Sequence, residues 1–571
     1  MDQDLLLQLK NTLEGDIETN ADILESHSTD YSIFKIKPKV VVFPRHSQDI
    51  QKLVKWVQEK RGEGGCGDIN LTVRAAGTCM SGGSLNDSII IDTTRYMNEI
   101  LEVSQQDLGF QTGPTEHRYP ISGLARVSPG VYYRDFEKET TKQGLVLPCF
   151  PASKNLCAVG GMVANNGAGE KSLKYGQNKD FVQELKVVLA DGNEYTVKSI
   201  SKTELEVKVI EDTFEGRLYR SVWNIIKRNR EDIENARPVT SKNSSGYLVW
   251  DVWNEESQTF DLTKLIVGAQ GTTAIITEIT YKLVPLEKFS NLLVIFANSI
   301  KDLPAMVHDL KKLDVETIEV YDNHTFTFAV KFFGDFLKDK GFLGIIKYVF
   351  NFLPELFLVL FGGVPKFVML VEFVSNDPKE IHSEIVEAQR YIKKYKVRSR
   401  VLEKQSQIEK YWNIRRDSFK LLTDHSKKLR TTPFIDDTVV PVEYLPDYLL
   451  ELVELLEEYK LLYTIAGHLG SGNLHIIPLM DFNNPKTEEI ILELSPKVYK
   501  LVKKYHGSMT AEHNDGLIRT PFLSMMFGET MTQVFKEIKE AFDEQYIFNP
   551  KKKVGATMKD IKNHMVQPRQ N

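Results

Sequence analysis

The sequence feature that most restricts the fold is a glycine-rich segment, RAAGTCMSGG, at residues 74–83. It directly follows residues 71–73, a short apolar run that is predicted to be a β-strand. Glycines in such a loop let backbone N–H groups approach an anion closely, as the binding of a pyrophosphate requires. A tight surface loop of the same composition is the alternative interpretation of this segment taken alone.

Three further motifs follow in the chain. PGV at residues 129–131 precedes a predicted helix, PAS at 151–153 precedes CAVGGMVANNGAG at 157–169, and GAQGTTAIIT occupies residues 268–277. In content and order these segments resemble the FAD-binding domain of the vanillyl-alcohol-oxidase-like flavoproteins. The resemblance implies that FAD lies extended in this domain, with its pyrophosphate against residues 74–83. The residues that it assigns to FAD binding are Arg74, Gly77, Thr78, Ser81, Gly82, Gly83, Pro151, Ser153, Gly160, Gly161, Ala164, Asn165, Gly167, Gly271, Ile276 and Asn549.

The sequence departs from the family motifs at several positions. Cys79 and Met80 replace Gly and Leu in the first motif, and Gln270 and Ala274 replace Glu and Gly in the last. Relatives that bind FAD covalently often use a histidine in the first loop, where this chain has Thr78. We therefore expect non-covalent FAD.

Length and composition limit the class of protein. A chain of 571 residues exceeds the usual size of one hydrophobic core, so two or three domains are expected. A net charge of −6 argues against a nucleic-acid partner. The four cysteines lack the spacing of a metal pair or an iron–sulfur cluster, which favours a reducing compartment and leaves no cluster to accept electrons. The first residues lack the basic and apolar regions of a signal peptide, so a cytoplasmic location is expected.

Short strands and helices mix irregularly in the first half. Strands are expected at residues 40–43, 89–91, 185–189 and 265–267, and a helix is expected to begin at Ser47. The pattern is that of an α+β fold rather than a regular βαβ alternation.

From Glu287 onward the pattern changes to strand, helix, strand, strand, helix. The strands are expected at residues 292–297, 319–321 and 367–373, and the helices at 305–313 and 378–395. This order favours a ferredoxin-like substrate domain.

The expected fold class is therefore α+β, with a two-subdomain FAD-binding domain of the vanillyl-alcohol-oxidase type, a ferredoxin-like substrate (cap) domain and C-terminal helices. The expected boundaries are an N-terminal helical segment at 1–37, the FAD-binding domain at 38–285, the substrate domain at 286–545 and a tail at 546–571 that returns to the FAD-binding domain.

An apolar insertion is expected at residues 331–365. Its longest uncharged run, residues 356–365, is half of the roughly 20 residues that a spanning helix needs, and Lys347 and Glu355 interrupt the rest. A spanning helix is therefore not expected. Two interpretations remain: a buried pair of helices, or a segment that lies on a membrane surface.

The second half contains two histidine motifs. GHLGSGNLH at residues 467–475 holds two imidazoles across a glycine-rich turn that leads into a strand, and GSMTAEH at 507–513 adds a carboxylate and a third imidazole. Two histidines and one glutamate form a ligand set suited to Zn²⁺ or Mn²⁺, with positions left open for substrate oxygens. Each histidine alone is as well explained as a hydrogen-bonded loop residue.

Together these motifs resemble the signatures of the D-lactate, glycolate and D-2-hydroxyglutarate dehydrogenase branch, as does the ending NPKKK at residues 549–553. The resemblance implies that His468, His475 and Glu512 bind the metal and that His513 is the base. In such a mechanism the substrate hydroxyl loses its proton to His513, and the C2 hydrogen leaves as a hydride to the flavin N5. Asn473 is expected to hydrogen-bond substrate or flavin.

The segment YWNIRR at residues 411–416 matches Arg415 to the substrate-binding arginine of this branch, and Arg416 is expected to be a solvated charge. The 2-hydroxyglutarate enzymes carry a Thr and a Lys where this chain has Phe419 and, approximately, Ile435. Their loss favours a small monocarboxylate, D-lactate first. Glycolate and D-2-hydroxyglutarate are the alternatives within the branch.

Two other classes of protein share some of these features. An alkyl-glycerone-phosphate synthase-like transferase shares the fold, but its run of consecutive histidines is not visible here. A non-catalytic flavin-binding protein would leave the histidine motifs without a purpose. The expected electron acceptor is a quinone, a cytochrome or an electron-transfer flavoprotein, with peripheral contact to the cytoplasmic face of a membrane through residues 331–365 as the interfacial alternative.

Overall fold

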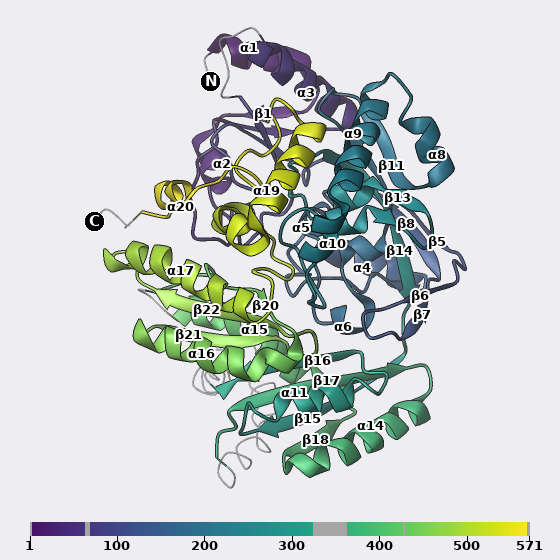
Figure 1. Ribbon diagram of the computed structural model, residues 1–571, viewed down its shortest axis with the longest axis vertical. Helices are drawn as coiled ribbons and strands as arrows, with labels where there is room; N and C mark the ends of the chain where they lie inside the picture. The colour runs from purple at the N-terminus through teal and green to yellow at the C-terminus, as the bar shows by residue number, and fades with distance from the viewer. Residues whose placement is uncertain (1–2, 63–68, 324–362, 426–428, 568–571) are drawn as a thin grey trace, which may run out of the picture.

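The computed structural model describes residues 3–62, 69–323, 363–425 and 429–567, with residues 417–425 described by their backbone alone. Two halves follow one another along the chain, the first purple to teal and the second green, and the last elements, in yellow, return to the first half (Figure 1). Both halves combine sheets with packed helices, so the predicted α+β class is confirmed.

The first sheet leads into the glycine-rich loop. Its strand order is β1-β2-β4-β3, in which β2, β4 and β3 are parallel and β1 is antiparallel to β2. All residues of β2 and β4 are buried, as is usual for parallel strands that are covered on both faces. The bounds are β1 (Asp16–Glu18), β2 (Val40–Phe43), β3 (Leu71–Arg74) and β4 (Ile89–Asp92), with α3 (Ser47–Gly62) packed on the sheet. β2, β3, β4 and the helix from Ser47 confirm the predictions made for them.

The N-terminal segment contains a strand in addition to the predicted helices. It contains α1 (Gln3–Thr12) and α2 (Ala21–Ser26), as expected, but β1 lies between them and pairs with β2. A strand of only three residues is too short to give a periodic signal in the sequence.

The second sheet of the first half is antiparallel, with the order β12-β13-β11-β10-β14-β8-β5, and β9 also pairs with β14. Its strands are β5 (Ile100–Gln105), β8 (Gly123–Val127), β9 (Leu145–Val146), β10 (Val182–Val188), β11 (Glu194–Ser201), β12 (Trp253–Asn254), β13 (Thr259–Asp261) and β14 (Ile275–Pro285). Its core includes side chains of α4 (Tyr133–Lys142) and α9 (Phe214–Arg228).

The strand predicted at residues 265–267 is wrong. The structure has a 3-10 helix, η2 (Leu262–Leu265), followed by a turn. Asp261 caps η2 by accepting a hydrogen bond from the backbone N–H of Thr263 at 2.9 Å. Residues 265–267 are buried, so their apolar character reflects burial rather than pairing in a sheet.

The third sheet begins in the second half and includes a ferredoxin-like unit. The chain order β15-α11-β16-β17-α14-β18 folds into the spatial order β18-β15-β17-β16, which confirms the predicted topology. The bounds are β15 (Phe289–Ala297), α11 (Leu303–Leu310), β16 (Thr317–Asp322), β17 (Phe367–Ser375), α14 (Pro378–Ile392) and β18 (Arg398–Leu402).

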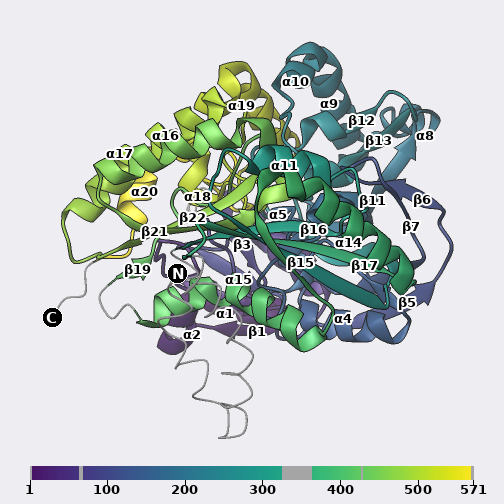
Figure 2. The same ribbon diagram turned by 90° about the horizontal axis from the view of Figure 1, so that it is seen from below.

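Alternate residues of the central strands face different helices. Leu293 and Ile295 pack with α11 and α14, whereas Leu292 and Val294 pack with α15 (Gln405–His425). Successive side chains of a strand point to opposite faces of the sheet, so both faces are covered. Figure 2 shows α14 and α15 on opposite sides of the sheet.

A β-hairpin extends this sheet and leads to the candidate site. β21 (Leu462–His468) pairs with β16 and, through η6 (Leu469–Ser471), with β22 (Asn473–Met480). The remaining pairs on β22 are β19 (Arg430–Thr431) and β20 (Thr438–Val439). The helices α16 (Leu445–Glu458) and α17 (Lys486–Lys504) share a hydrophobic core with β22.

The C-terminal elements return to the first half, where α19 (Leu523–Phe542) lies beside α9 (Figure 1). The backbone then runs next to β3, where Asn549 N–H donates to Leu71 O at 2.7 Å. The last helix is α20 (Met558–His564).

Among the described residues, no helix has the length and apolar character needed to cross a membrane. The predicted insertion at 331–365 lies outside the described residues except for its last three, so both interpretations of it stay predictions.

Candidate active site

The β21–β22 hairpin brings His468 and His475 together. His468 pairs with Asn473 across the two strands and His475 pairs with Ala466, so the two histidines form a diagonal pair on one face. Their ring centroids lie 5.3 Å apart. The turn requires glycine at residue 472, where φ is +70° and an added Cβ would lie 1.9 Å from the carbonyl oxygen of Val440.

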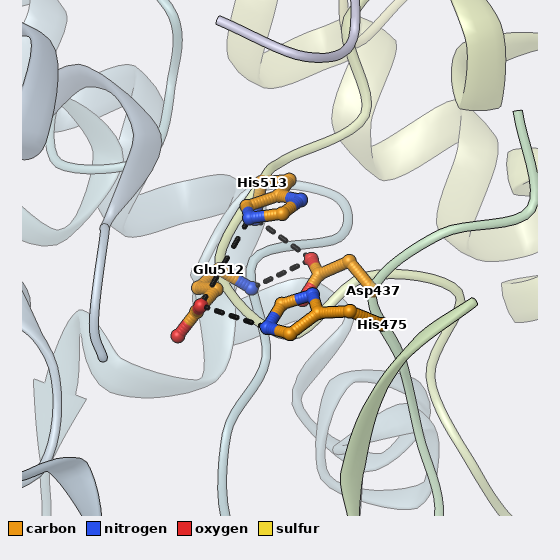
Figure 3. A group of neighbouring side chains, drawn as sticks. All are labelled: Asp437, His475, Glu512 and His513. Atoms are coloured by element: carbon orange, nitrogen blue, oxygen red, sulfur yellow. Dashed lines mark hydrogen bonds and ion pairs between the residues drawn. The ribbon is translucent and has the colours of Figure 1, made fainter. Parts of the chain in front are cut away.

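The loop after α17 carries Glu512 and His513 to the same place. Asp437 holds this loop, because its Oδ2 accepts hydrogen bonds from the backbone N–H groups of Glu512 at 2.9 Å and His513 at 2.7 Å, and from Thr510 Oγ1 at 2.5 Å. Figure 3 shows Asp437 against this loop, with Glu512 to one side of the rings of His475 and His513 and its carboxylate close to both.

One oxygen of Glu512 is the centre of the cluster. Its Oε1 lies 3.1 Å from Nε2 of His468, 3.6 Å from Nε2 of His475 and 3.9 Å from Nε2 of His513. The structure thus brings together the three predicted metal ligands and the predicted base.

Two carboxylates orient the three imidazoles by contacting their Nδ1 atoms. Glu319 Oε1 lies 2.6 Å from Nδ1 of His468, whereas Asp436 lies 3.3 Å from Nδ1 of His475 and 2.7 Å from Nδ1 of His513. With a carboxylate at each Nδ1, every ring presents Nε2 to Glu512. Sequence reasoning missed Glu319 and Asp436. In the sequence each of them is only an acidic residue beside apolar residues, which does not indicate a role in the site.

Burial and the carboxylates shift the pKa values in opposite directions. Burial disfavours the charged form of His513, but Asp437 and Asp436 outweigh it and raise the pKa to about 9. For His475 burial is stronger than Asp436 and lowers the pKa. Burial would raise the pKa of Glu512, but Lys242 and His468 hold it well below the usual value, so Glu512 is a carboxylate.

The donor set fits a divalent metal ion. Asp437, His475, Glu512 and His513 offer ligand atoms within 4.8 Å of one another. Both oxygens of Asp437 are already engaged, since Oδ1 also accepts from Asn473 Nδ2 at 3.1 Å, whereas Nε2 of His468 faces Glu512 directly. We therefore regard His468, His475 and Glu512 as the better ligand set. Two imidazoles and one carboxylate suit Zn²⁺ or Mn²⁺.

One cavity of about 820 Å³ joins this cluster to the glycine-rich loops. Its size is within the range of cofactor and ligand sites. His475, Glu512, His513 and Arg415 line it. Of the residues predicted to bind FAD, those that line the same cavity are Gly77, Thr78, Gly83, Pro151, Ser153, Gly160, Gly161, Ala164, Asn165, Gly167, Gly271 and Ile276.

The other four residues predicted to bind FAD, which are Arg74, Ser81, Gly82 and Asn549, do not line the cavity. Asn549 Nδ2 donates to the carbonyl oxygens of Gly83 at 2.8 Å and Gln270 at 2.6 Å, so it braces two loops. Ser81 Oγ donates to His513 O at 3.2 Å, and Gly82 packs on Phe34.

The guanidinium of Arg74 has one nitrogen whose hydrogen bonds are not satisfied. Its Nη2 donates to Thr29 O at 2.9 Å, but Nη1 is buried and has no hydrogen-bond partner among the described residues. Buried polar atoms are rarely unpaired, so an orphaned cationic N–H beside the glycine-rich loop fits a bound anion such as the pyrophosphate of FAD.

Arg415 and Arg416 both line the cavity. Nε of Arg415 donates to Glu319 Oε2 at 3.1 Å, so Glu319 links this arginine to His468. The prediction of a solvated Arg416 is wrong, because Nε of Arg416 donates to Glu170 Oε2 at 3.0 Å and the side chain is half-buried. The two halves meet at this turn of α15, so adjacent residues are both covered.

Lys242 is a site residue that sequence reasoning did not identify. Its Nζ donates to Glu512 Oε2 at 3.0 Å and to Asn473 Oδ1 at 2.9 Å. Asn473, which was expected to contact substrate or flavin, is fully buried and is not part of the cavity wall; it bonds Lys242, Asp437 and Thr438 instead.

Family models agree with the two halves. A model of the FAD binding domain matches residues 38–198, and a model of the C-terminal domain of FAD linked oxidases matches residues 286–553. The chain thus contains an FAD binding domain and the C-terminal domain of FAD linked oxidases.

Several curated proteins are similar over nearly the whole chain. A D-2-hydroxyglutarate dehydrogenase of Pantoea ananatis is 29% identical over 94% of this chain and 50% of its own length. The glycolate oxidase subunit GlcD of Bacillus subtilis is 24% identical over 94% of this chain and 92% of its own. A D-lactate dehydrogenase of Anaerostipes hadrus is 24% identical over 95% and 94%. The chain thus spans about half the length of the first of these relatives.

Solved structures share the fold. A 4-ethylphenol oxidase from Gulosibacter chungangensis has a TM-score of 0.66 at 14% identity, covering 98% of both chains. A p-cresol methylhydroxylase has a TM-score of 0.65 at 12% identity, again over 98% of both chains. The predicted fold, with a flavin-binding domain of this type, is confirmed.

Proposed function

We propose that the chain oxidises a D-2-hydroxy acid to the 2-oxo acid, with non-covalent FAD and a divalent metal ion. The observation that carries the proposal is that Glu512 and His513 open into the same cavity as the glycine-rich loops. Similarity to D-2-hydroxyglutarate and D-lactate dehydrogenases and to a glycolate oxidase subunit supports this class of substrate.

Each cofactor would meet residues of suitable chemistry. FAD would be held by the loops around residues 77–83, 151–167 and 271–276, and it supplies a two-electron hydride acceptor. A Zn²⁺ or Mn²⁺ ion would be held by His468, His475 and Glu512, and it supplies Lewis acidity toward the substrate hydroxyl.

The chain's own residues would bind the acid and take its proton. The guanidinium of Arg415, on the cavity wall, offers hydrogen bonds to the substrate carboxylate. Nε2 of His513 faces the cluster while Nδ1 is held by Asp436, so Nε2 is the atom that accepts the hydroxyl proton. The pKa of about 9 applies to His513 without a metal ion, and a dication bound by Glu512 would lower this pKa toward neutrality.

Two candidate substrates are each supported by a different observation. D-Lactate is favoured by the absence of the Thr and Lys of the hydroxyglutarate enzymes; Ile435 is fully buried and cannot reach a ligand. D-2-Hydroxyglutarate is favoured by Arg430, which lines the same cavity and could meet a second carboxylate, and by the relatives of that name.

Anaerobic mixing with D-lactate, D-2-hydroxyglutarate, the L-forms of these two acids and the achiral glycolate, followed by flavin absorbance, tests the proposal. We expect D-2-hydroxy acids to bleach the flavin and L-acids to leave it oxidised. No bleaching by any hydroxy acid would contradict the function. Substitution of Arg430 by Ala should slow reduction by D-2-hydroxyglutarate more than by D-lactate if the second carboxylate meets it.

For the electron acceptor we propose a quinone, a cytochrome or an electron-transfer flavoprotein, because the cysteines of the chain lack cluster spacing. Peripheral membrane contact through residues 331–365 belongs to the same proposal. Deletion of residues 332–364 should release the protein from membrane fractions, and unchanged partitioning would count against the contact.

A further inference from the structure

Lys242 is an unusual cation because its side chain is 0% exposed and its main partner belongs to the candidate metal site. An ammonium group is costly to bury unless it is paired and hydrogen-bonded. Here Nζ has two partners, Glu512 Oε2 and Asn473 Oδ1. The lysine comes from the first half of the chain, whereas both partners come from the second.

The segment around Lys242 is fixed to the site loops on both sides. Ser241 Oγ donates to Ser471 O at 2.7 Å, in the turn between the two histidine strands. Ser244 Oγ donates to Ala511 O at 2.8 Å, next to Glu512. The position of Nζ is therefore defined relative to both loops that supply the candidate ligands.

The two oxygens of Glu512 have different surroundings. Oε1 faces the imidazole nitrogens, whereas Oε2 accepts a hydrogen bond from Lys242. The ammonium beside Oε2 weakens that oxygen as a metal ligand, which favours binding of a metal ion through Oε1 alone. A catalytic metal site needs positions that remain open to substrate, and a carboxylate bound through both oxygens would fill one of them.

Charge gives Lys242 a second effect. Four buried carboxylates surround the cluster, namely Glu319, Asp436, Asp437 and Glu512. The substrates of the proposed function are anions, which such a site repels at short range. A cation beside Glu512 offsets part of this repulsion.

We propose that Lys242 is a positioning residue that restricts Glu512 to one-oxygen binding of the metal ion and so keeps the site open to a chelating anion. The inference rests on the proposed function. It assigns to the FAD-binding half of the chain a direct part in the metal site of the other half.

The test uses the full-length flavoprotein loaded with Co²⁺, whose visible spectrum reports its coordination, and oxalate as a chelating anion. Lys242→Met removes the charge and the hydrogen bonds. Lys553→Met is the matched control, since Nζ of Lys553 is also buried and bonds the same segment, at Gly246 O (2.7 Å) and at Asp515 Oδ2 (2.9 Å), without touching Glu512. Lys242→Arg keeps the charge and a donor.

For Lys242→Met we expect Co²⁺ affinity equal to or tighter than that of the wild type, and oxalate affinity of the Co²⁺-loaded protein at least about 10-fold weaker, because an occupied position and a lost charge both oppose the anion. Lys242→Arg should recover part of the oxalate affinity. Flavin content should be retained in both Lys242 variants.

Three results would overturn the inference. The first is oxalate affinity of Lys242→Met within twofold of the wild type. The second is a parallel loss of flavin, Co²⁺ and oxalate, matching Lys553→Met, which would indicate a structural role only. The third is a wild type that takes up no Co²⁺ at this site, which would also remove the metal from the proposed function. A wild type that binds Co²⁺ and oxalate but is reduced by no hydroxy acid contradicts the proposed function and leaves the role of Lys242 intact.

Discussion

Nδ1 of His513 donates to Oδ2 of Asp436 at 2.7 Å. The other oxygen of Asp436 lies 3.3 Å from Nδ1 of His475, so one buried carboxylate orients both a candidate metal ligand and the candidate base. Such a shared carboxylate couples the geometry of metal binding to that of proton transfer.

Asp436→Asn should therefore impair both functions at once. Carboxylates behind metal-binding histidines typically contribute about 10- to 100-fold to metal affinity or activity. We expect metal affinity and the rate of flavin reduction each to fall in that range while flavin stays bound. Metal titration and stopped-flow absorbance measure the two effects, and a change in only one of them would contradict the shared role.

His513→Gln should separate chemistry from binding. Removal of a general base costs about 10²–10⁴-fold in rate. The variant should retain flavin and metal, because His513 is outside the preferred ligand set, yet lose most of its reduction by hydroxy acids. Flavin absorbance and metal content give the control. Fast bleaching by this variant would exclude His513 as the base.

Arg415→Lys should weaken substrate binding. A hydrogen bond between charged groups contributes about 1.5–3 kcal/mol, so we expect KM to rise about 10- to 100-fold, with a smaller change in kcat. Arg416→Lys, one residue along the same helix and paired with Glu170, should change KM less. Equal effects of the two substitutions would argue against Arg415 as the carboxylate-binding residue.

Removal of the metal ion by a chelator should abolish reduction without releasing flavin. The loss of Lewis acidity should slow flavin bleaching by about 10²-fold or more, and added Zn²⁺ or Mn²⁺ should restore it. His468→Ala should resemble the chelated protein and resist rescue. Activity that survives complete metal removal would contradict a metal-assisted mechanism.

Glu372, on β17, allows a test of stability against pH. Burial raises its pKa to about 7, from 4.5 in the unfolded chain. The folded protein therefore holds this proton more strongly, and the stabilisation it provides is complete below pH 4.5 and is lost as pH rises through 7. Glu372→Gln should have a higher Tm than the wild type at pH 8 and a similar Tm at pH 5. Identical Tm differences at the two pH values would be inconsistent with the raised pKa.

The sequence predicted the parts of the site that are local in the chain. His468 and His475 lie on adjacent strands of one hairpin, so a short motif contains the whole geometry. Glu512 and His513 are consecutive residues, so one short motif contains both of them as well. The glycine-rich loops were likewise recognisable, because their function depends on backbone conformation at a few consecutive residues.

The parts that were missed come from distant segments. Lys242 is 270 residues from Glu512, and Glu319 is 149 residues from His468. In sequence, Glu319 is one of several polar residues in a mixed strand and Lys242 is one lysine in a loop rich in small residues, so neither has a local signal. Only the assembled fold pairs them with the histidine cluster. The false strand at 265–267 has the opposite cause, since burial alone makes a short segment apolar.

Anomalous diffraction from crystals of the FAD-loaded protein soaked with Mn²⁺ tests the central claim most directly. The account predicts a peak bonded by Nε2 of His468, Nε2 of His475 and Oε1 of Glu512, in the same cavity as the flavin ring. A fully bound flavin with no peak at these atoms, or with the ring in a separate cavity, would contradict it.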